Sequence, residues 1–159
     1  MPKIHLTTSI NAPIQRCFDL SRSIDLHMAS TAKTNERAIA GVTEGLINKG
    51  EQVTWLAKHF GIDQTLTAQI TEMDSPHSFT DVQLKGAFKS MKHVHSFEQK
   101  GERTIMKDEF EFESPLGLIG ELFNKLILTA YMKRFLIERN HVIKTISESN
   151  EWKKYLSFL

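Results

Sequence analysis

Apolar and polar residues alternate through most of the chain before Ser114, which is the pattern of half-buried β-strands. Turn-forming residues, such as Asn48-Lys49-Gly50 and Asp74-Ser75-Pro76, separate the alternating stretches. Because short turns join most of them, the pattern predicts a seven-stranded antiparallel sheet. The expected strands are Lys3–Ile10, Thr34–Gly41, Gln52–Phe60, Gln64–Glu72, Phe79–Lys85 and two strands within Met91–Phe112.

Helical patterns follow the first strand and the last. Pro13 is placed to open a short helix that runs through Leu20, and a second short helix surrounds Ile24–Met28. Ser114 and Pro115 together form a strong helix start. Apolar residues then recur at helical spacing from about Leu118 to Ser147, so we expect a final helix of roughly 30 residues and about 45 Å, long enough to cross the whole sheet.

The length and composition indicate one ordinary globular domain. With 159 residues and a net charge of +1, the chain has no basic field that would favour nucleic acid. Its apolar runs are far shorter than the ~18 residues that a membrane span needs, so we expect no stable membrane insertion. No signal peptide is visible, and the single cysteine, Cys17, excludes an internal disulfide, which fits a cytoplasmic protein.

The end of the chain looks like an extension of this domain. We expect a domain over residues 1–149 and a C-terminal extension over residues 150–159, in which Trp152, Tyr155 and Leu156 accompany two lysines. Three explanations are open for the extension: packing back on the domain, a homodimer contact, or contact with a membrane surface. Back-packing is the one we favour.

The last two strands carry polar residues on the face that the apolar pattern turns inward. Successive strand residues point to opposite faces, so His93 and His95 share the inner face of one strand, and Asp108 lies on the inner face of the next. Buried polar groups cost free energy unless they are paired, so this patch requires a reason. The apolar residues of the same face are Met91, Phe97, Met106, Phe110 and Phe112.

One strand, two short helices, six strands and a long final helix is the element order of an α+β helix-grip fold. Several segments, in order and spacing, resemble the SRPBCC superfamily, also called the polyketide cyclase/dehydrase or START-like superfamily. The resemblance implies a curved sheet wrapped around the final helix with an apolar cavity between them, and it implies no particular reaction. The segments are Ile10–Pro13, Cys17–Leu20, Asp25–His27, Phe79–Asp81, Lys85–Phe88, His93–Phe97, Thr104–Asp108, Ser114–Gly117 and Arg139–Asn140.

The function expected from these residues is the binding of a small, largely apolar or amphipathic molecule in that cavity. Apolar contacts are expected from Trp55, Met91, Phe97, Met106 and Phe110, and polar contacts from Gln83, His93, His95 and Asp108. Two alternatives remain. The polar residues could form a network that only satisfies itself. They could also serve a cyclase- or hydratase-like enzyme in which Asp108 orients His93 or His95 as a general base.

No cofactor is expected, and we commit to no catalytic or metal-binding residue. A minor alternative gives His93, His95 and Asp108 to a divalent ion, because two histidines and one carboxylate can form a facial triad. Other polar residues are weaker candidates. His27 could close one end of the cavity or simply be solvated. Arg139 would face solvent from the outer side of the final helix, and on the inner side it would need a carboxylate or an anionic ligand. His5, His77 and His141 are expected to be exposed.

Overall fold

The computed structural model of the protein describes residues 1–114, 122 and 124–157. Seven strands form one antiparallel sheet in the order β1-β7-β6-β5-β4-β3-β2. The number, direction and approximate bounds of the predicted strands are confirmed. The strands are β1 (Lys3–Ile10), β2 (Arg37–Gly41), β3 (Gln52–His59), β4 (Ile62–Asp74), β5 (Ser78–Lys85), β6 (Ser90–Lys100) and β7 (Arg103–Glu113).

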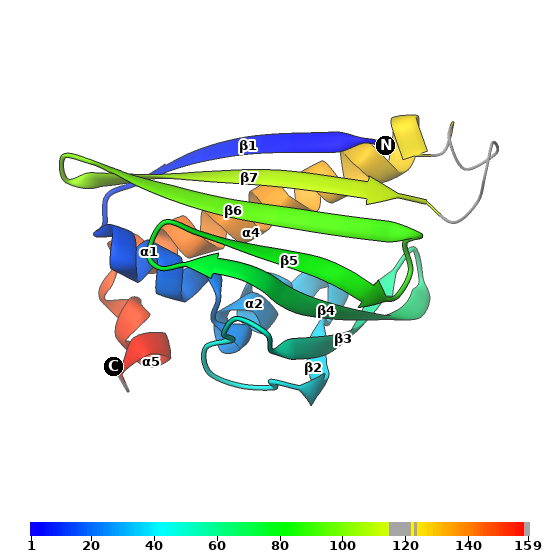
Figure 1. The fold of residues 1–159 in the computed structure, drawn as a ribbon, viewed down its shortest axis with the longest axis horizontal. Coiled ribbons are helices and arrows are strands. Elements are labelled where there is room, and N and C mark those ends of the chain that lie inside the picture. The colour runs from blue at the N-terminus through cyan, green and yellow to red at the C-terminus, as the bar shows by residue number, and fades with distance from the viewer. Residues whose placement is uncertain (115–121, 123, 158–159) are drawn as a thin grey trace.

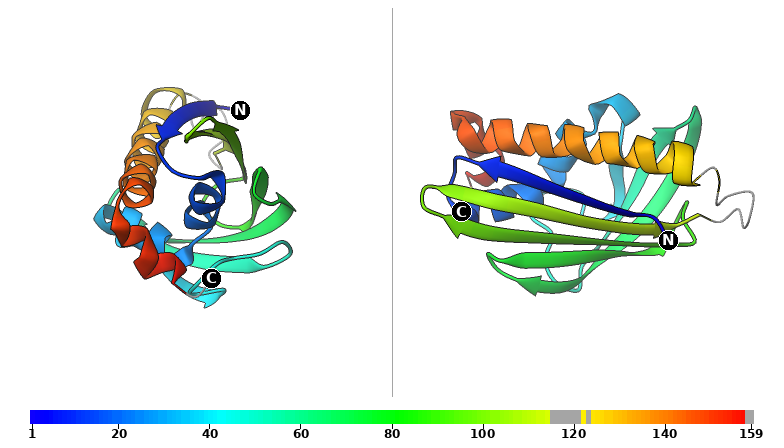
Figure 2. Two further views of the ribbon diagram at one scale, coloured as in Figure 1. Left: turned by 90° about the vertical axis from the view of Figure 1, so that its left-hand side faces the viewer. Right: turned by 90° about the horizontal axis from the view of Figure 1, so that it is seen from above.

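The helices lie against one face of this sheet (Figure 1). Figure 2 shows the sheet curving around the long helix α4, with α1 and α2 beside it. None of the helices formed by the described residues is long and apolar enough to cross a membrane. The helical elements are α1 (Ile14–Ser21), α2 (Ile24–Ser30), η1 (Ala32–Thr34), the π-helical turn η2 (Asn124–Leu128), α4 (Thr129–Glu148), η3 (Asn150–Trp152) and α5 (Lys153–Leu156).

One predicted strand boundary differs from the structure, and the predicted start of the final helix lies outside the described residues. The strand expected from Thr34 begins only at Arg37, because Thr34 ends the 3-10 turn η1 and Asn35 adopts a left-handed backbone with φ of 49°. Asparagine tolerates that conformation better than most residues, and the extended strand begins only after it. The start expected for the final helix, Pro115 to Gly120, lies outside the described residues.

The interior contains two apolar clusters. One gathers α1 and α2 against the sheet around Phe18, which is fully buried, and includes Cys17, as expected for a small core residue. The other packs the first half of α4, through Met132 and Leu136, onto Phe110 and Phe112 of β7. The C-terminal helix α5 belongs to the first cluster, because its Leu156 packs there and is only 5% exposed. This contact is the arrangement that back-packing of the extension predicts.

Candidate functional site

A cavity of about 360 Å³ lies between the sheet and α4, where the two apolar clusters meet. Its size falls in the range of small-molecule sites. Most of its wall is apolar, and its polar residues converge on a few places. Apolar residues of the wall include Val53, Trp55, Ala68, Ile70, Phe79, Met91, Phe110, Met132, Phe135 and Leu136.

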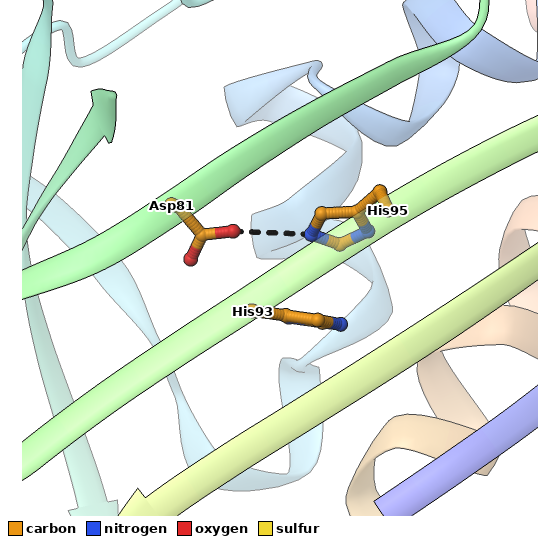
Figure 3. Close-up of side chains that lie close together, drawn as sticks. All are labelled: Asp81, His93 and His95. Atoms are coloured by element: carbon orange, nitrogen blue, oxygen red, sulfur yellow. Dashed lines mark hydrogen bonds and ion pairs between the residues drawn. The ribbon is translucent and has the colours of Figure 1, made fainter. Parts of the chain in front are cut away.

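The main polar group of the wall is a network on β5, β6 and β7. The strand register places His95 directly opposite Asp108, as expected from the sequence, and His93 opposite Asp81 of β5. Nε2 of His93 lies 2.9 Å from Oδ1 of Asp108, and Nδ1 of His95 lies 3.1 Å from the same oxygen. On the other side, Nε2 of His95 lies 3.1 Å from Oδ1 of Asp81 (Figure 3).

The final helix completes this network. Nδ2 of Asn140, on α4, donates a hydrogen bond of 2.6 Å to Oδ2 of Asp108. Asp108 is 1% exposed, so both of its oxygens are held inside the protein. Burial alone would raise the pKa of Asp108, but His93 and His95 outweigh it and hold the pKa well below its ordinary value. Asp108 is therefore an ionised acceptor that fixes the two rings.

The two histidines differ in their electrostatics, although they are two residues apart. Burial and the neighbouring His95 lower the pKa of His93 more than the two carboxylates raise it. Burial also acts to lower the pKa of His95, but its contacts with Asp108 and Asp81 outweigh that effect and raise it. Asp81 and Asp108 therefore flank His95 on two sides and favour its charged form.

A second polar group lies where α2, β2 and α4 meet. The ring of His27 stacks on Trp55 at 4.1 Å between centroids, and its Nε2 lies 3.2 Å from Oε1 of Glu36. Burial acts to raise the pKa of Glu36, but its charge interactions and hydrogen bond with His27 lower it overall, with smaller contributions from His59 and Arg139. His27 therefore lines the cavity, as one of its two expected placements has it.

Arg139 lies on the inner face of α4 and is 5% exposed. Its Nη2 donates a hydrogen bond of 2.9 Å to the carbonyl of Ser21, while its Nη1 is buried without a hydrogen-bond partner among the described residues. The guanidinium also lowers the pKa values of Glu36 and Asp81 through its charge. The cavity thus contains a buried cation with one unused donor group.

Not every residue predicted for the wall lies in it. Trp55, Met91, His93, His95 and Phe110 do line the cavity. Phe97 and Met106 instead belong to the solid cluster around Phe18, because α1 covers that end of the sheet. Asp108 sits behind the histidines, and Gln83 uses its amide to bind the backbone of Phe88. Gln83, Phe97, Met106 and Asp108 are thus predicted contacts that are not among the residues lining this cavity.

Several polar residues of the site were not found from the sequence. Glu36, Tyr131 and Asn140 carry no alternation or spacing signal that distinguishes them, since their roles depend on which elements meet in three dimensions. Tyr131 shares a hydrogen bond of 2.7 Å with Nδ1 of His59. Asp81 lies on the strand before the histidines, and its register opposite His93 is the signal that could have placed it in the site. His5, His77 and His141 are exposed, as expected.

Comparison with known proteins gives a likeness in structure. No family model matches the sequence, and no curated protein matches it. Among solved structures, TTHA0849 from Thermus thermophilus is 16% identical and superposes with a TM-score of 0.71 over 92% of this chain and 99% of that chain. Ginseng major latex-like protein 151 from Panax ginseng is 18% identical, with a TM-score of 0.67 over 93% and 98% of the two chains.

A START superfamily protein from Mycobacterium smegmatis is similar to a comparable extent. It is 11% identical, and it superposes with a TM-score of 0.69 over 92% of this chain and 97% of that chain. At these identities the likeness concerns the fold. The chain therefore has the START-like helix-grip fold, as the sequence resemblance predicted.

Proposed function

We propose that the protein binds a small, largely apolar molecule that carries an oxygen acceptor, in the cavity between the sheet and α4. The observation that carries this proposal is the contrast within the wall: apolar side chains cover most of it, and the charged groups gather at the Asp81, His93 and His95 network, at His27 with Glu36, and at Arg139. That combination is typical of small-molecule sites. The apolar body of the ligand would lie against Trp55, Met91 and Phe110.

The oxygen acceptor is inferred from Arg139. Its Nη1 is buried beside the cavity and has no hydrogen-bond partner among the described residues. Leaving a buried charged donor unsatisfied is costly, and a ligand oxygen would remove that cost. A hydroxyl, carbonyl or carboxylate oxygen could all serve. His93 and His95 supply further polar contacts on the opposite, strand side of the cavity.

The first test is native mass spectrometry of freshly purified protein, compared with the denatured mass. We expect extra mass in the native spectrum that denaturation releases. A second test titrates an environment-sensitive apolar dye into stripped protein. Ala68→Phe, which places a ring in the cavity wall, should abolish dye binding, whereas Ala29→Phe on the exposed side of α2 should not. Equal dye binding by the two folded variants would contradict the proposal.

A second candidate function is a cyclase- or hydratase-like reaction. The observation that favours it is the orientation of His93 by an ionised Asp108 at 2.9 Å, with His93 itself in the cavity wall. A lowered pKa keeps His93 neutral and able to accept a proton. His95→Ala and Asp108→Ala distinguish the two functions. A binder loses affinity or stability in these variants, whereas an enzyme loses turnover while binding is largely kept.

A further inference from the structure

Three side chains of the cavity wall form a compact cluster of potential metal ligands. Asp81 on β5 and His93 and His95 on β6 each offer one ligand atom, and these atoms all lie within 4.8 Å of one another. Figure 3 shows the three side chains on one side of the two paired strands. All three line the cavity, so an ion held there would face its interior.

The cluster is a consequence of strand geometry. Asp81 and His93 are direct partners in the antiparallel register of β5 and β6, and His95 lies two residues further along on the same face. The side chains are thus held by two hydrogen-bonded strands rather than by loops. Rigid elements position a first coordination shell more accurately than loops do.

The spacing of Asp81 and His95 suits one small cation. Nε2 of His95 and Oδ1 of Asp81 are 3.1 Å apart. Two ligand atoms that each lie about 2.1 Å from one ion stand roughly 3.0–3.4 Å apart at octahedral or tetrahedral angles. An ion could therefore replace the proton that Asp81 and His95 now share, with little movement of either side chain.

A second layer of contacts orients these ligands. Asp108 lies within 3.1 Å of Nε2 of His93 and Nδ1 of His95, which leaves the other nitrogen of each ring available to an ion. Asn140 holds Asp108 in turn. The contact of His93 is a hydrogen bond, and histidines that ligate metals commonly give their other ring nitrogen to a carboxylate in this way, which sets the tautomer and increases their basicity as ligands. Nδ1 of His95 has no hydrogen-bond partner among the described residues, so its contact with Asp108 is electrostatic.

We propose that Asp81, His93 and His95 bind one divalent first-row transition-metal ion, with at least one coordination position open toward the cavity. Imidazole and carboxylate ligands suit zinc, iron, cobalt or nickel, and three protein ligands with an open position are the arrangement of reactive rather than structural sites. Asp81 is the carboxylate ligand, and Asp108, which the sequence pattern offered for this role, is the positioning residue. Metal binding at this cluster does not depend on the apolar ligand.

The test uses wild-type protein stripped with a chelator and titrated with cobalt(II). We expect binding at one ion per chain, a visible absorption spectrum, displacement by zinc, and a higher melting temperature with the ion. Asp81→Asn and His93→Gln should each lose binding. Asp108→Asn should keep the spectrum but weaken affinity by about 10- to 100-fold, because it alters only the orientation of the ligands.

The control is a triple variant of exposed histidines, His5→Gln, His77→Gln and His141→Gln, which should bind cobalt as the wild type does. Proton NMR of the cobalt form gives a reading that requires no variant: two exchangeable imidazole signals, strongly shifted by the ion, are expected. Absence of stoichiometric binding, unchanged binding in Asp81→Asn, or loss in the triple variant would each overturn the proposal. Dye binding by the stripped protein tests the apolar cavity without any metal. It therefore distinguishes failure of metal binding from failure of the proposed ligand binding.

Discussion

Asn140 donates a hydrogen bond of 2.6 Å to Asp108, and this bond joins the middle of α4 to the middle of β7. The preceding residue, Arg139, donates to the carbonyl of Ser21 at the end of α1. Two consecutive residues of one helix therefore bind two different elements. Between them they determine how α4 sits over the cavity and over the histidines of β6.

Replacing Asn140 should measurably loosen this attachment. Asn140→Ala removes a buried hydrogen bond to an ionised carboxylate, so we expect the free energy of unfolding to fall by about 1.5–3 kcal/mol. Urea unfolding followed by circular dichroism measures this change. Asn150→Ala, at an exposed position, should alter stability by less than about 0.5 kcal/mol. Equal stabilities of the two variants would show that the bond to Asp108 contributes nothing.

Glu36 should contribute to stability in a defined pH range. Its pKa in the folded protein lies below the ordinary value of 4.5, since His27 outweighs the effect of burial. The unfolded chain therefore binds more protons in this range, and the stabilisation is present above about pH 4.5 and lost as the pH falls through the folded value. Glu36→Gln should lose stability at neutral pH and depend less steeply on pH in acid. Urea unfolding of the wild type and of Glu36→Gln over a pH series tests both expectations. If the free energies of unfolding of the two proteins changed with pH in parallel, the prediction would be wrong.

The charge of Arg139 should help to lower the pKa values of the carboxylates around it. Arg139→Met removes the charge but keeps an apolar chain of similar length, so we expect the pKa values of Glu36 and Asp81 to rise. Carboxyl carbon NMR of the folded variant measures these values directly. Glu148 is stabilised by Asn11 and Lys144, and its pKa should stay the same and serve as the internal control.

The C-terminal extension should stabilise the domain through Leu156. This side chain is buried in the cluster around Phe18, and Arg16 lies 4.3 Å from the ring centroid of Trp152 nearby. Leu156→Ala should cost about 2–4 kcal/mol and lower the melting temperature by roughly 5–15 °C in a domain of this size. Deleting residues 150–159 should cost at least as much. Lys153→Ala, at an exposed site, is the control and should leave the melting temperature unchanged. If Leu156→Ala and the deletion also left it unchanged, packing of the extension would be contradicted.

The strand pattern predicted the polar patch because a pleated strand leaves little freedom. Once His93 faces inward, His95 must also do so, and the short Gly101 turn places Asp108 opposite His95. What the pattern could not predict is which inward residues meet a cavity. Phe97 faces inward as well, but α1 brings Phe18 against it at 5.6 Å between ring centroids, so that end of the sheet is solid.

Polar contacts between elements that are distant in the sequence could not be predicted either. The contact of Asn140 with Asp108 depends on the rotation of α4 about its axis, which the sequence pattern of that helix did not determine. Glu36 precedes β2 in an irregular stretch, and its role follows from the stacking of His27 on Trp55. Local periodicity therefore predicts the fold and the facing of side chains, while the chemistry of the cavity depends on how the layers meet.

The pairing of β1 with β7 sets an order of events during synthesis. Lys3 pairs with Glu111 and Ile10 with Thr104, so β1 cannot pair with β7 until about a hundred further residues have been made. At about 5–20 residues per second, this interval lasts roughly 5–20 seconds. The strands β2 to β6 can meet their neighbours sooner, since hairpins join them in sequence. Of the seven strands of this sheet, the one made earliest thus has to wait longest for its partner, and Ile4 and Ile10 lack their neighbours on β7 until then.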